Sequence, residues 1–140
     1  MATSISEVMT RDPVTASSET PVVEVARIMR DRDIGPVVVV DGGSVRGIVT
    51  DRDIVLRGVA EGKDLTAVTV AEVCSGDVEA VSPDDTVESA VSRMQAADVR
   101  RLPVVDGQRV VGIVSMGDLA VEEALPASAI ADISAASPNN

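Results

Sequence analysis

The chain has 140 residues, 45% of them hydrophobic, which is enough for one ordinary domain or for two small units that share a core. It has no Phe, Tyr or Trp, so it lacks the aromatic platforms on which proteins stack single-stranded nucleic acids. Its net charge of −11 repels phosphate backbones, and the absence of His excludes histidine-based acid–base catalysis and most zinc and iron sites. We therefore expect neither a nucleic-acid partner nor a bound metal ion.

The cellular location is also predicted from composition. The single cysteine, Cys74, cannot form an internal disulfide, which favours a reducing compartment. Residues 1–9 lack the charged and then apolar pattern of a signal peptide. The longest apolar runs, such as residues 37–40, are far too short to span a membrane. We predict a cytoplasmic protein without a membrane partner.

The first half of the chain begins with a predicted strand and helix. Residues 13–16 read as a short extended stretch. Thr20 before Pro21 is a suitable pair for the N-cap and first position of a helix. Apolar residues then recur at helical spacing and predict one buried face: Val22, Val25, Ala26 and Met29.

A hairpin and a second helix are predicted to follow. Two β-branched runs, residues 37–40 and 45–49, are separated by Asp-Gly-Gly-Ser at residues 41–44, which is a hairpin signal. We expect a final helix over residues 52–59. The first half therefore predicts a β-α-β-β-α unit, followed by a linker over residues 58–68.

The second half repeats the first without a gap at a spacing of 65 residues, as in the pairs Glu7 and Glu72 or Asp53 and Asp118. The same order of elements is expected. Its helix has capping-box spacing between Asp85 and Glu88. Its other predicted features are an extended stretch at 78–81, a helical face at Val87, Ala90, Val91 and Met94, strands at 102–105 and 110–114, and a helix at 117–125.

The predicted fold class is thus α/β (α+β), with two tandem β-α-β-β-α repeats packed with pseudo-twofold symmetry, because a repeat of this kind buries its apolar face against a neighbour. We predict residues 1–62 as the first repeat and 63–125 as the second. Residues 126–140 are rich in Ala, Ser, Pro and Asn and predict a flexible tail.

The end of the second hairpin strand carries the candidate chemistry in both repeats. Thr50 precedes Asp53 by three residues, Ser115 precedes Asp118 in the same way, and both pairs follow Gly-Ile-Val. A hydroxyl and free N–H groups at a helix start suit a phosphate, and a carboxylate three residues later can accept hydrogen bonds from a ribose diol. The same spacing also suits a helix cap. The two roles are compatible, because the hydroxyl can cap in the empty state and bind phosphate in the filled state.

These motifs resemble the repeats of the CBS domain family. The run Arg-Leu-Pro-Val-Val-Asp at residues 101–106, followed by Gly-Ile-Val-Ser at 112–115 and by Asp118, is typical of a CBS repeat. Residues 33–35 and 47–53 are similar, and the resemblance extends over about residues 5–125. Two such repeats form a Bateman module, and Thr-Asp-Arg-Asp-Ile-Val at residues 50–55 resembles the stand-alone CBS pairs of the hypoxic-response type.

The resemblance implies two clefts, each of which combines residues from both repeats. In the family the Asp binds ribose and the preceding Ser or Thr binds phosphate. The first cleft would contain Thr50, Asp51, Arg52, Asp53, Glu79, Ala80, Arg100 and Arg101. The second would contain Val14, Thr15, Gly35, Pro36, Ser115, Met116, Gly117 and Asp118.

The two predicted clefts differ in charge. The Asp53 cleft has Arg52, Arg100 and Arg101 nearby, and arginine suits phosphate through its forked donors. The Asp118 cleft has Gly and Pro at the corresponding positions. We therefore expect the Asp53 cleft to bind more tightly, the alternative being that Arg100 and Arg101 form a solvated surface pair.

The function that the resemblance implies is a regulatory sensor without catalytic residues or a required cofactor. AMP, ADP and ATP are the expected ligands, and S-adenosylmethionine, NADH and cyclic dinucleotides are the further candidates. The alternative is a module without a nucleotide ligand that dimerises or docks on another protein through its helical faces. An enzyme is not expected, because there is no His, one Cys and no clustered acid pair in a recognised arrangement. CBS pairs commonly pair again, so we expect a homodimer and leave open an unidentified regulated protein.

Overall fold

The structure is a computed structural model that describes residues 3–75 and 79–122. The predicted tail at residues 126–140 lies outside this range. Mixed helices and strands in two repeats confirm the predicted α/β (α+β) class. In chain order the elements are η1 (Ile5–Glu7), β1 (Thr10–Arg11), β2 (Thr15–Ala16), α1 (Val22–Arg32), β3 (Pro36–Asp41), β4 (Ser44–Thr50), α2 (Asp51–Asp53), η2 (Ile54–Val59), η3 (Val70–Glu72), α3 (Val87–Ala97), β5 (Arg101–Asp106), β6 (Arg109–Ser115) and α4 (Met116–Glu122).

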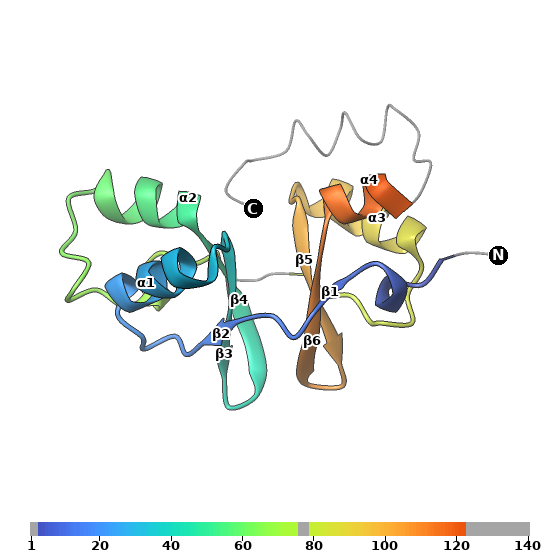
Figure 1. Ribbon diagram of the computed structural model, residues 1–140, viewed down its shortest axis with the longest axis horizontal. Helices are drawn as coiled ribbons and strands as arrows, with labels where there is room; N and C mark the ends of the chain where they lie inside the picture. Colours follow the sequence, from blue (N-terminus) through green and yellow to red (C-terminus); the bar gives the residue numbers. More distant parts are fainter. Residues whose placement is uncertain (1–2, 76–78, 123–140) are drawn as a thin grey trace. The chain divides into compact units, whose positions relative to one another are not determined.

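The chain folds into two compact units. One unit is Val14–Val78, and the other joins the N-terminal segment up to Pro13 to the chain from Glu79 onward. The first has a three-stranded sheet in the order β2-β3-β4, and the second has a sheet in the order β1-β6-β5. In each unit the helices lie beside one face of the sheet, α1 and α2 in the first and α3 and α4 in the second (Figure 1). Both predicted hairpins are confirmed, with each strand one residue longer at both ends than expected.

The compact units are offset from the sequence repeats, because each sheet is extended by residues from the start of the other repeat. In β1, Thr10 pairs antiparallel with Ile113 of β6. At the equivalent place in the other unit, Ser75 forms an antiparallel bridge with Ile48 of β4. Residues 10 and 75, like 48 and 113, are 65 positions apart. The same contact therefore occurs twice, and each time a segment of one sequence repeat pairs with the last strand of the other repeat's hairpin.

Two short 3-10 helices, η1 and η3, precede these pairing segments and were not predicted. They place Ile5 and Val70 in the two cores, where both side chains are fully buried. Their sequence signal is a hydroxyl residue three positions before a glutamate. The glutamate carboxylate accepts a hydrogen bond from the N–H of Ser4 at 2.8 Å in η1 and from that of Thr69 at 3.0 Å in η3.

The N-caps of the two longer helices lie one residue later than predicted. Pro21, not Thr20, is the N-cap of α1. In α3 the cap is Thr86, whose hydroxyl accepts a hydrogen bond from the N–H three residues later at 3.1 Å. The predicted capping box at Asp85 is wrong, because its carboxylate turns back and accepts from the N–H of Ser82 at 2.8 Å.

Each unit has its own aliphatic core, built without aromatic residues from the predicted helical faces and the middle of the strands. Burial of these side chains supplies the main driving force for folding. One core contains Val22, Val25, Met29, Val37, Val39, Val49, Ile54, Val70 and Val73. The other contains Ile5, Val81, Val87, Ala90, Val91, Met94, Leu102, Val104, Val114 and Leu119. Over residues 3–75 and 79–122, no helix has the length and hydropathy to cross a membrane.

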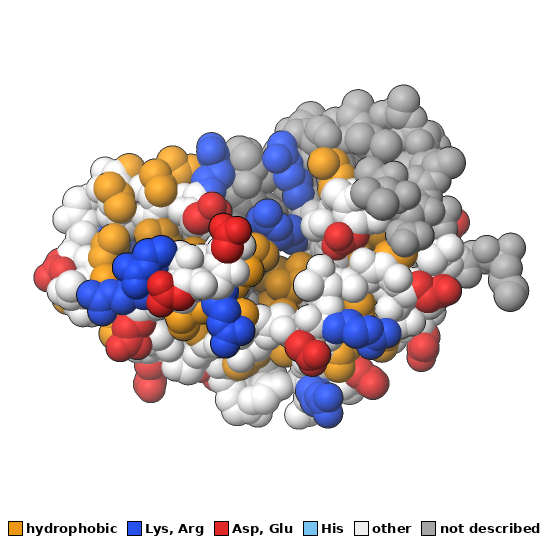
Figure 2. All heavy atoms as spheres, viewed as in Figure 1, with side chains coloured by type: hydrophobic (Ala, Val, Ile, Leu, Met, Phe, Trp, Pro, Cys, Tyr) orange, Lys and Arg blue, Asp and Glu red, His pale blue; other side chains and the backbone are white. Residues whose placement is uncertain are grey.

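The helix predicted over residues 52–59 is divided into the short α2 and the π-helix η2. Ile54 of η2 is buried in the core, whereas Val55, Leu56 and Val59 are 54%, 40% and 58% exposed. Figure 2 shows hydrophobic side chains gathered on the surface over this helix. The helix therefore packs on its unit through one side only.

Candidate functional site

The first strand-to-helix turn holds Thr50 and Asp53 in a reciprocal pair of hydrogen bonds. The N–H of Thr50 donates to Asp53 Oδ2 at 2.9 Å, and the N–H of Asp53 donates to Thr50 Oγ1 at 3.1 Å. Thr50 is 2% exposed and Asp53 is fully buried. The expected capping arrangement is confirmed here, and it fixes the carboxylate at the point where β4 ends.

The second turn has the same local geometry in a more open setting. The N–H of Ser115 donates to Asp118 Oδ2 at 3.0 Å, and the N–H of Asp118 donates to Ser115 Oγ at 3.2 Å. Both side chains are half-buried. Two equivalent carboxylates therefore differ in their access to water.

The charge around the two turns differs as well. Arg57 Nη1 lies 3.9 Å from Asp53 Oδ1, one helical turn further along the chain. The residue at the corresponding position after Asp118 is Glu122. The first carboxylate thus has a cation at i+4 where the second has an acid. Burial and the nearby Asp53 carboxylate raise the pKa of the Cys74 thiol.

In the unit Val14–Val78 the structure brings the predicted site residues to one end of the sheet. The Gly35 carbonyl accepts a hydrogen bond from the N–H of Asp51 at 3.1 Å. Pro36 lies opposite Thr50 in the β3–β4 pair. Thr15, with its neighbour at position 14, belongs to the chain that runs parallel to β3. These contacts place the start of β3 directly beside the turn that carries the hydroxyl and the carboxylate.

The other unit repeats this arrangement with different side chains. The Arg100 carbonyl accepts a hydrogen bond from the N–H of Met116 at 2.9 Å, and Arg101 lies opposite Ser115 in the β5–β6 pair. Both arginines are half-buried. Gly117 and Arg52 occupy equivalent exposed positions in the two turns.

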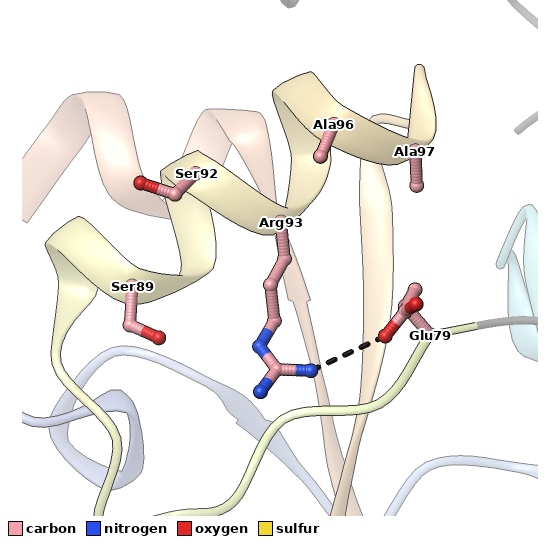
Figure 3. A pocket seen from close by; sticks show the side chains of 6 residues that line it. All are labelled: Glu79, Ser89, Ser92, Arg93, Ala96 and Ala97. Atoms are coloured by element: carbon pink, nitrogen blue, oxygen red, sulfur yellow. Dashed lines mark hydrogen bonds and ion pairs between the residues drawn. The ribbon is translucent and has the colours of Figure 1, made fainter.

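An arginine of α3, which the sequence did not single out, holds the predicted contact segment Glu79–Ala80. Arg93 Nη1 donates to the Ala80 carbonyl at 3.1 Å and lies 3.2 Å from Glu79 Oε2 (Figure 3). The ion pair borders an open groove of about 460 Å³ that is lined by Glu79, Ser89, Ser92, Arg93, Ala96 and Ala97. A shallower hollow of about 250 Å³ lies over Asp51, Arg52, Val55 and Leu56.

Each unit therefore contains half of the predicted contacts of each cleft. The combination of Asp53 with Glu79, Ala80, Arg100 and Arg101 joins the two units, and it stays a prediction. The same holds for Asp118 with residues 14, 15, 35 and 36. Each unit by itself provides a capped turn that holds its carboxylate just after the end of a strand, β4 in one unit and β6 in the other.

Comparison with known proteins assigns the family. The model of the CBS domain family matches residues 5–59 and 70–124. Each of the two matches contains one of the duplicated turns, and the chain belongs to the CBS domain family.

Relatives of similar length share this organisation. The CBS domain-containing protein YhcV of Bacillus subtilis is 38% identical over 120 residues, which cover 86% of this chain and 85% of the relative. Hypoxic response protein 1 of Mycobacterium tuberculosis is 35% identical over 96 residues, with 68% and 67% of the two chains covered. The resemblance to the hypoxic-response type is therefore confirmed.

Solved structures are similar over most of the chain. A crystal structure of Hypoxic Response Protein I with two coordinated zinc ions has a TM-score of 0.77 and 30% identity, over 86% of this chain and 99% of that one. The CBS domain pair of protein MJ0100, in complex with 5′-methylthioadenosine and S-adenosyl-L-methionine, has a TM-score of 0.77 and 29% identity, over 86% and 95%.

The residues of this chain do not fit a zinc site of the usual kind. Protein zinc sites are built mainly from Cys and His ligands, and this chain has one Cys and no His. Among the residues that the structure describes, no group of three or more Cys, Asp or Glu side chains is placed to hold a metal ion. We therefore assign no role to zinc here.

Proposed function

We propose that this protein is a regulatory module that binds an adenine nucleotide, with AMP, ADP or ATP as ligand. The observation that carries the proposal is the duplicated turn, in which a hydroxyl and a carboxylate are held together by paired hydrogen bonds where a strand meets a helix. Asp53 and Asp118 would accept hydrogen bonds from the ribose, and Thr50 and Ser115 would donate to phosphate. The related pair from MJ0100 supports this choice, since both of its ligands contain adenosine.

Charge supports a tighter site at the first turn. The proposed Asp53 cleft adds the exposed Arg52 and the half-buried Arg100 and Arg101 to the hydroxyl of Thr50. Partly desolvated guanidinium groups bind phosphate strongly, because two parallel N–H donors match two phosphate oxygens. The proposed Asp118 cleft has no arginine among its members, so its phosphate contacts would depend on the Ser115 hydroxyl and backbone N–H groups.

Ligand binding at the first turn would require a local change. Asp53 is fully buried, and its Oδ2 already accepts the hydrogen bond from Thr50. A ribose can reach the carboxylate only if the surrounding side chains move and Asp53 exchanges a present partner for the sugar. We infer that the bound and empty forms differ around α2, which is the property that a sensor needs.

The proposal predicts that AMP or ATP stabilises the folded protein. A ligand at about 100 times its dissociation constant adds roughly 2.7 kcal/mol to the free energy of unfolding. For a chain of this size the melting temperature should rise by roughly 5–10 °C. Circular dichroism is the suitable probe, because the chain has no Trp or Tyr for intrinsic fluorescence.

The ligand panel should include ADP, S-adenosylmethionine, NADH and cyclic dinucleotides, with inorganic phosphate as the control for anion binding alone. A flat response to every adenine ligand would overturn the proposal. Recovery of unchanged AMP or ATP after incubation is expected for a binding module, and turnover would contradict it.

From the family resemblance we further propose a cytoplasmic homodimer. Sedimentation equilibrium of the same samples would report the dimer as twice the mass of one chain.

A further inference from the structure

The Arg57 side chain connects three groups of the Val14–Val78 unit. Its Nη1 lies 3.9 Å from Asp53 Oδ1, 3.3 Å from the Val73 carbonyl oxygen and 3.4 Å from Ser75 Oγ. The Arg57 side chain is 37% exposed, whereas the Asp53 side chain is fully buried. One guanidinium therefore bridges the candidate ribose-binding carboxylate and residues 73–75.

Ser75, at the end of this segment, extends the sheet of this unit by pairing with β4. The Ser75 N–H donates to the Ile48 carbonyl at 3.1 Å, and the Ile48 N–H donates to the Ser75 carbonyl at 3.3 Å. The chain continues from Ser75 through residues 76–78 to Glu79, where the other unit resumes. Arg57 thus acts on the end of the segment that links the two units along the chain.

The equivalent position in the second repeat cannot make this bridge. It is occupied by Glu122, and a carboxylate neither donates to a backbone carbonyl nor neutralises Asp118. The duplicated turns have the same cap but differ at this position, so a function based on Arg57 belongs to the first repeat.

We propose that Arg57 is a positioning residue that latches residues 73–75 to the Asp53 turn, and that a nucleotide on Asp53 releases the latch. Asp53 Oδ2 is held by the Thr50 N–H, so Oδ1, which faces Arg57, is the oxygen that a ribose hydroxyl would take. When the sugar binds Asp53 Oδ1, Arg57 loses its counter-charge. Its hydrogen bonds to the Val73 carbonyl and the Ser75 hydroxyl then become weaker. The release step rests on the proposed function, whereas the latch itself exists without ligand.

Amide hydrogen exchange at Ser75, followed by NMR, tests the latch directly. In the ligand-free protein, Arg57→Met should accelerate Ser75 exchange by about tenfold, because a hydrogen bond to a charged group is lost and the segment opens locally. Asp53→Asn should have a similar effect, since it removes the charge but keeps an acceptor for the cap. The double variant should add little to either single change, because both remove the same interaction.

Three controls separate the latch from general destabilisation. The Val38 N–H, which donates to the Val14 carbonyl at 3.0 Å in the same unit, should exchange as in the unchanged protein. Arg27→Met removes an exposed arginine of α1 in the same unit and should leave Ser75 exchange within about twofold, as expected for a surface side chain. Arg57→Lys should restore part of the protection, because it returns the charge without the forked donors.

The outcomes are distinguishable. Ser75 exchange that is unchanged in Arg57→Met, or that rises together with Val38 exchange, overturns the latch. Saturating AMP should accelerate Ser75 exchange in the unchanged protein and have no further effect in Arg57→Met. If AMP raises the melting temperature but leaves Ser75 exchange unchanged, release is wrong while the nucleotide site stands. If AMP does not bind, the proposed function and the release step both fail, and the ligand-free variants still decide the latch.

Discussion

Gly47→Ala is expected to lower the free energy of unfolding by about 2–4 kcal/mol, because overpacking against fixed backbone is among the costly single changes. A Cβ at Gly47 would overlap the Ser75 carbonyl oxygen. This oxygen cannot move away easily, since the Ser75 backbone makes two hydrogen bonds with Ile48. Thermal unfolding followed by circular dichroism should show a melting temperature roughly 8–15 °C below that of the unchanged protein.

Two other glycines provide matched controls. At Gly112 a Cβ would lie 2.6 Å from Met9 Sδ and 2.8 Å from the Thr10 carbonyl oxygen, and the Met9 side chain can move aside, so Gly112→Ala should cost less. At Gly35 the nearest atom would be at 3.5 Å, an ordinary contact, so Gly35→Ala should change stability by at most about 1 kcal/mol. A Gly47→Ala protein as stable as Gly35→Ala would contradict the pairing of Ser75 with β4.

The second large effect concerns ligand affinity. Asp53→Ala should weaken AMP binding by about 100-fold or more, because two hydrogen bonds from the ribose to a charged acceptor are lost. Asp118→Ala should retain most of the affinity, since the proposed Asp53 cleft includes arginines for the phosphate and the proposed Asp118 cleft does not. Isothermal titration calorimetry gives the affinity of both variants directly.

The stability of Asp53→Ala must be considered in this experiment. The substitution removes the acceptor of the Thr50 N–H and the counter-charge of Arg57, and it should cost about 1–3 kcal/mol of stability. Titrations therefore belong well below the melting temperature of the variant. Asp53→Asn, which retains an acceptor for the cap, serves as the second variant. Loss of binding in Asp118→Ala with binding retained in Asp53→Ala would reverse the assignment of the main site.

Much of the fold follows from local signals. The β-branched runs around Asp-Gly turns predicted both hairpins, and the helical spacing of Val22, Val25 and Met29 predicted the buried face of α1. The hydroxyl and carboxylate of the candidate site were also found from their spacing alone, since a cap involves residues only three positions apart. Repetition at 65 residues strengthened each of these predictions, because every local signal occurs twice.

Other features depend on residues that are distant in the sequence. Arg57 is relevant because it contacts Val73 and Ser75. Its position four residues after Asp53 is the only local pattern that involves it. Arg93 likewise became relevant only through its contacts with Glu79 and the Ala80 carbonyl. The difference in burial between the two candidate carboxylates was equally absent from the sequence, where their motifs look alike.

The sequence by itself determined that this is a duplicated β-α-β-β-α chain with a capped hydroxyl–carboxylate turn in each copy, because propensities, turns and caps act over a few residues. Only the tertiary structure decided that each sheet is extended by a segment from the start of the other repeat. It also decided that Asp53 is buried beside Arg57 while Asp118 is half-exposed. The physical reason is that strand pairing and burial are set by contacts between segments tens of residues apart, which leave little mark on the local pattern of either segment.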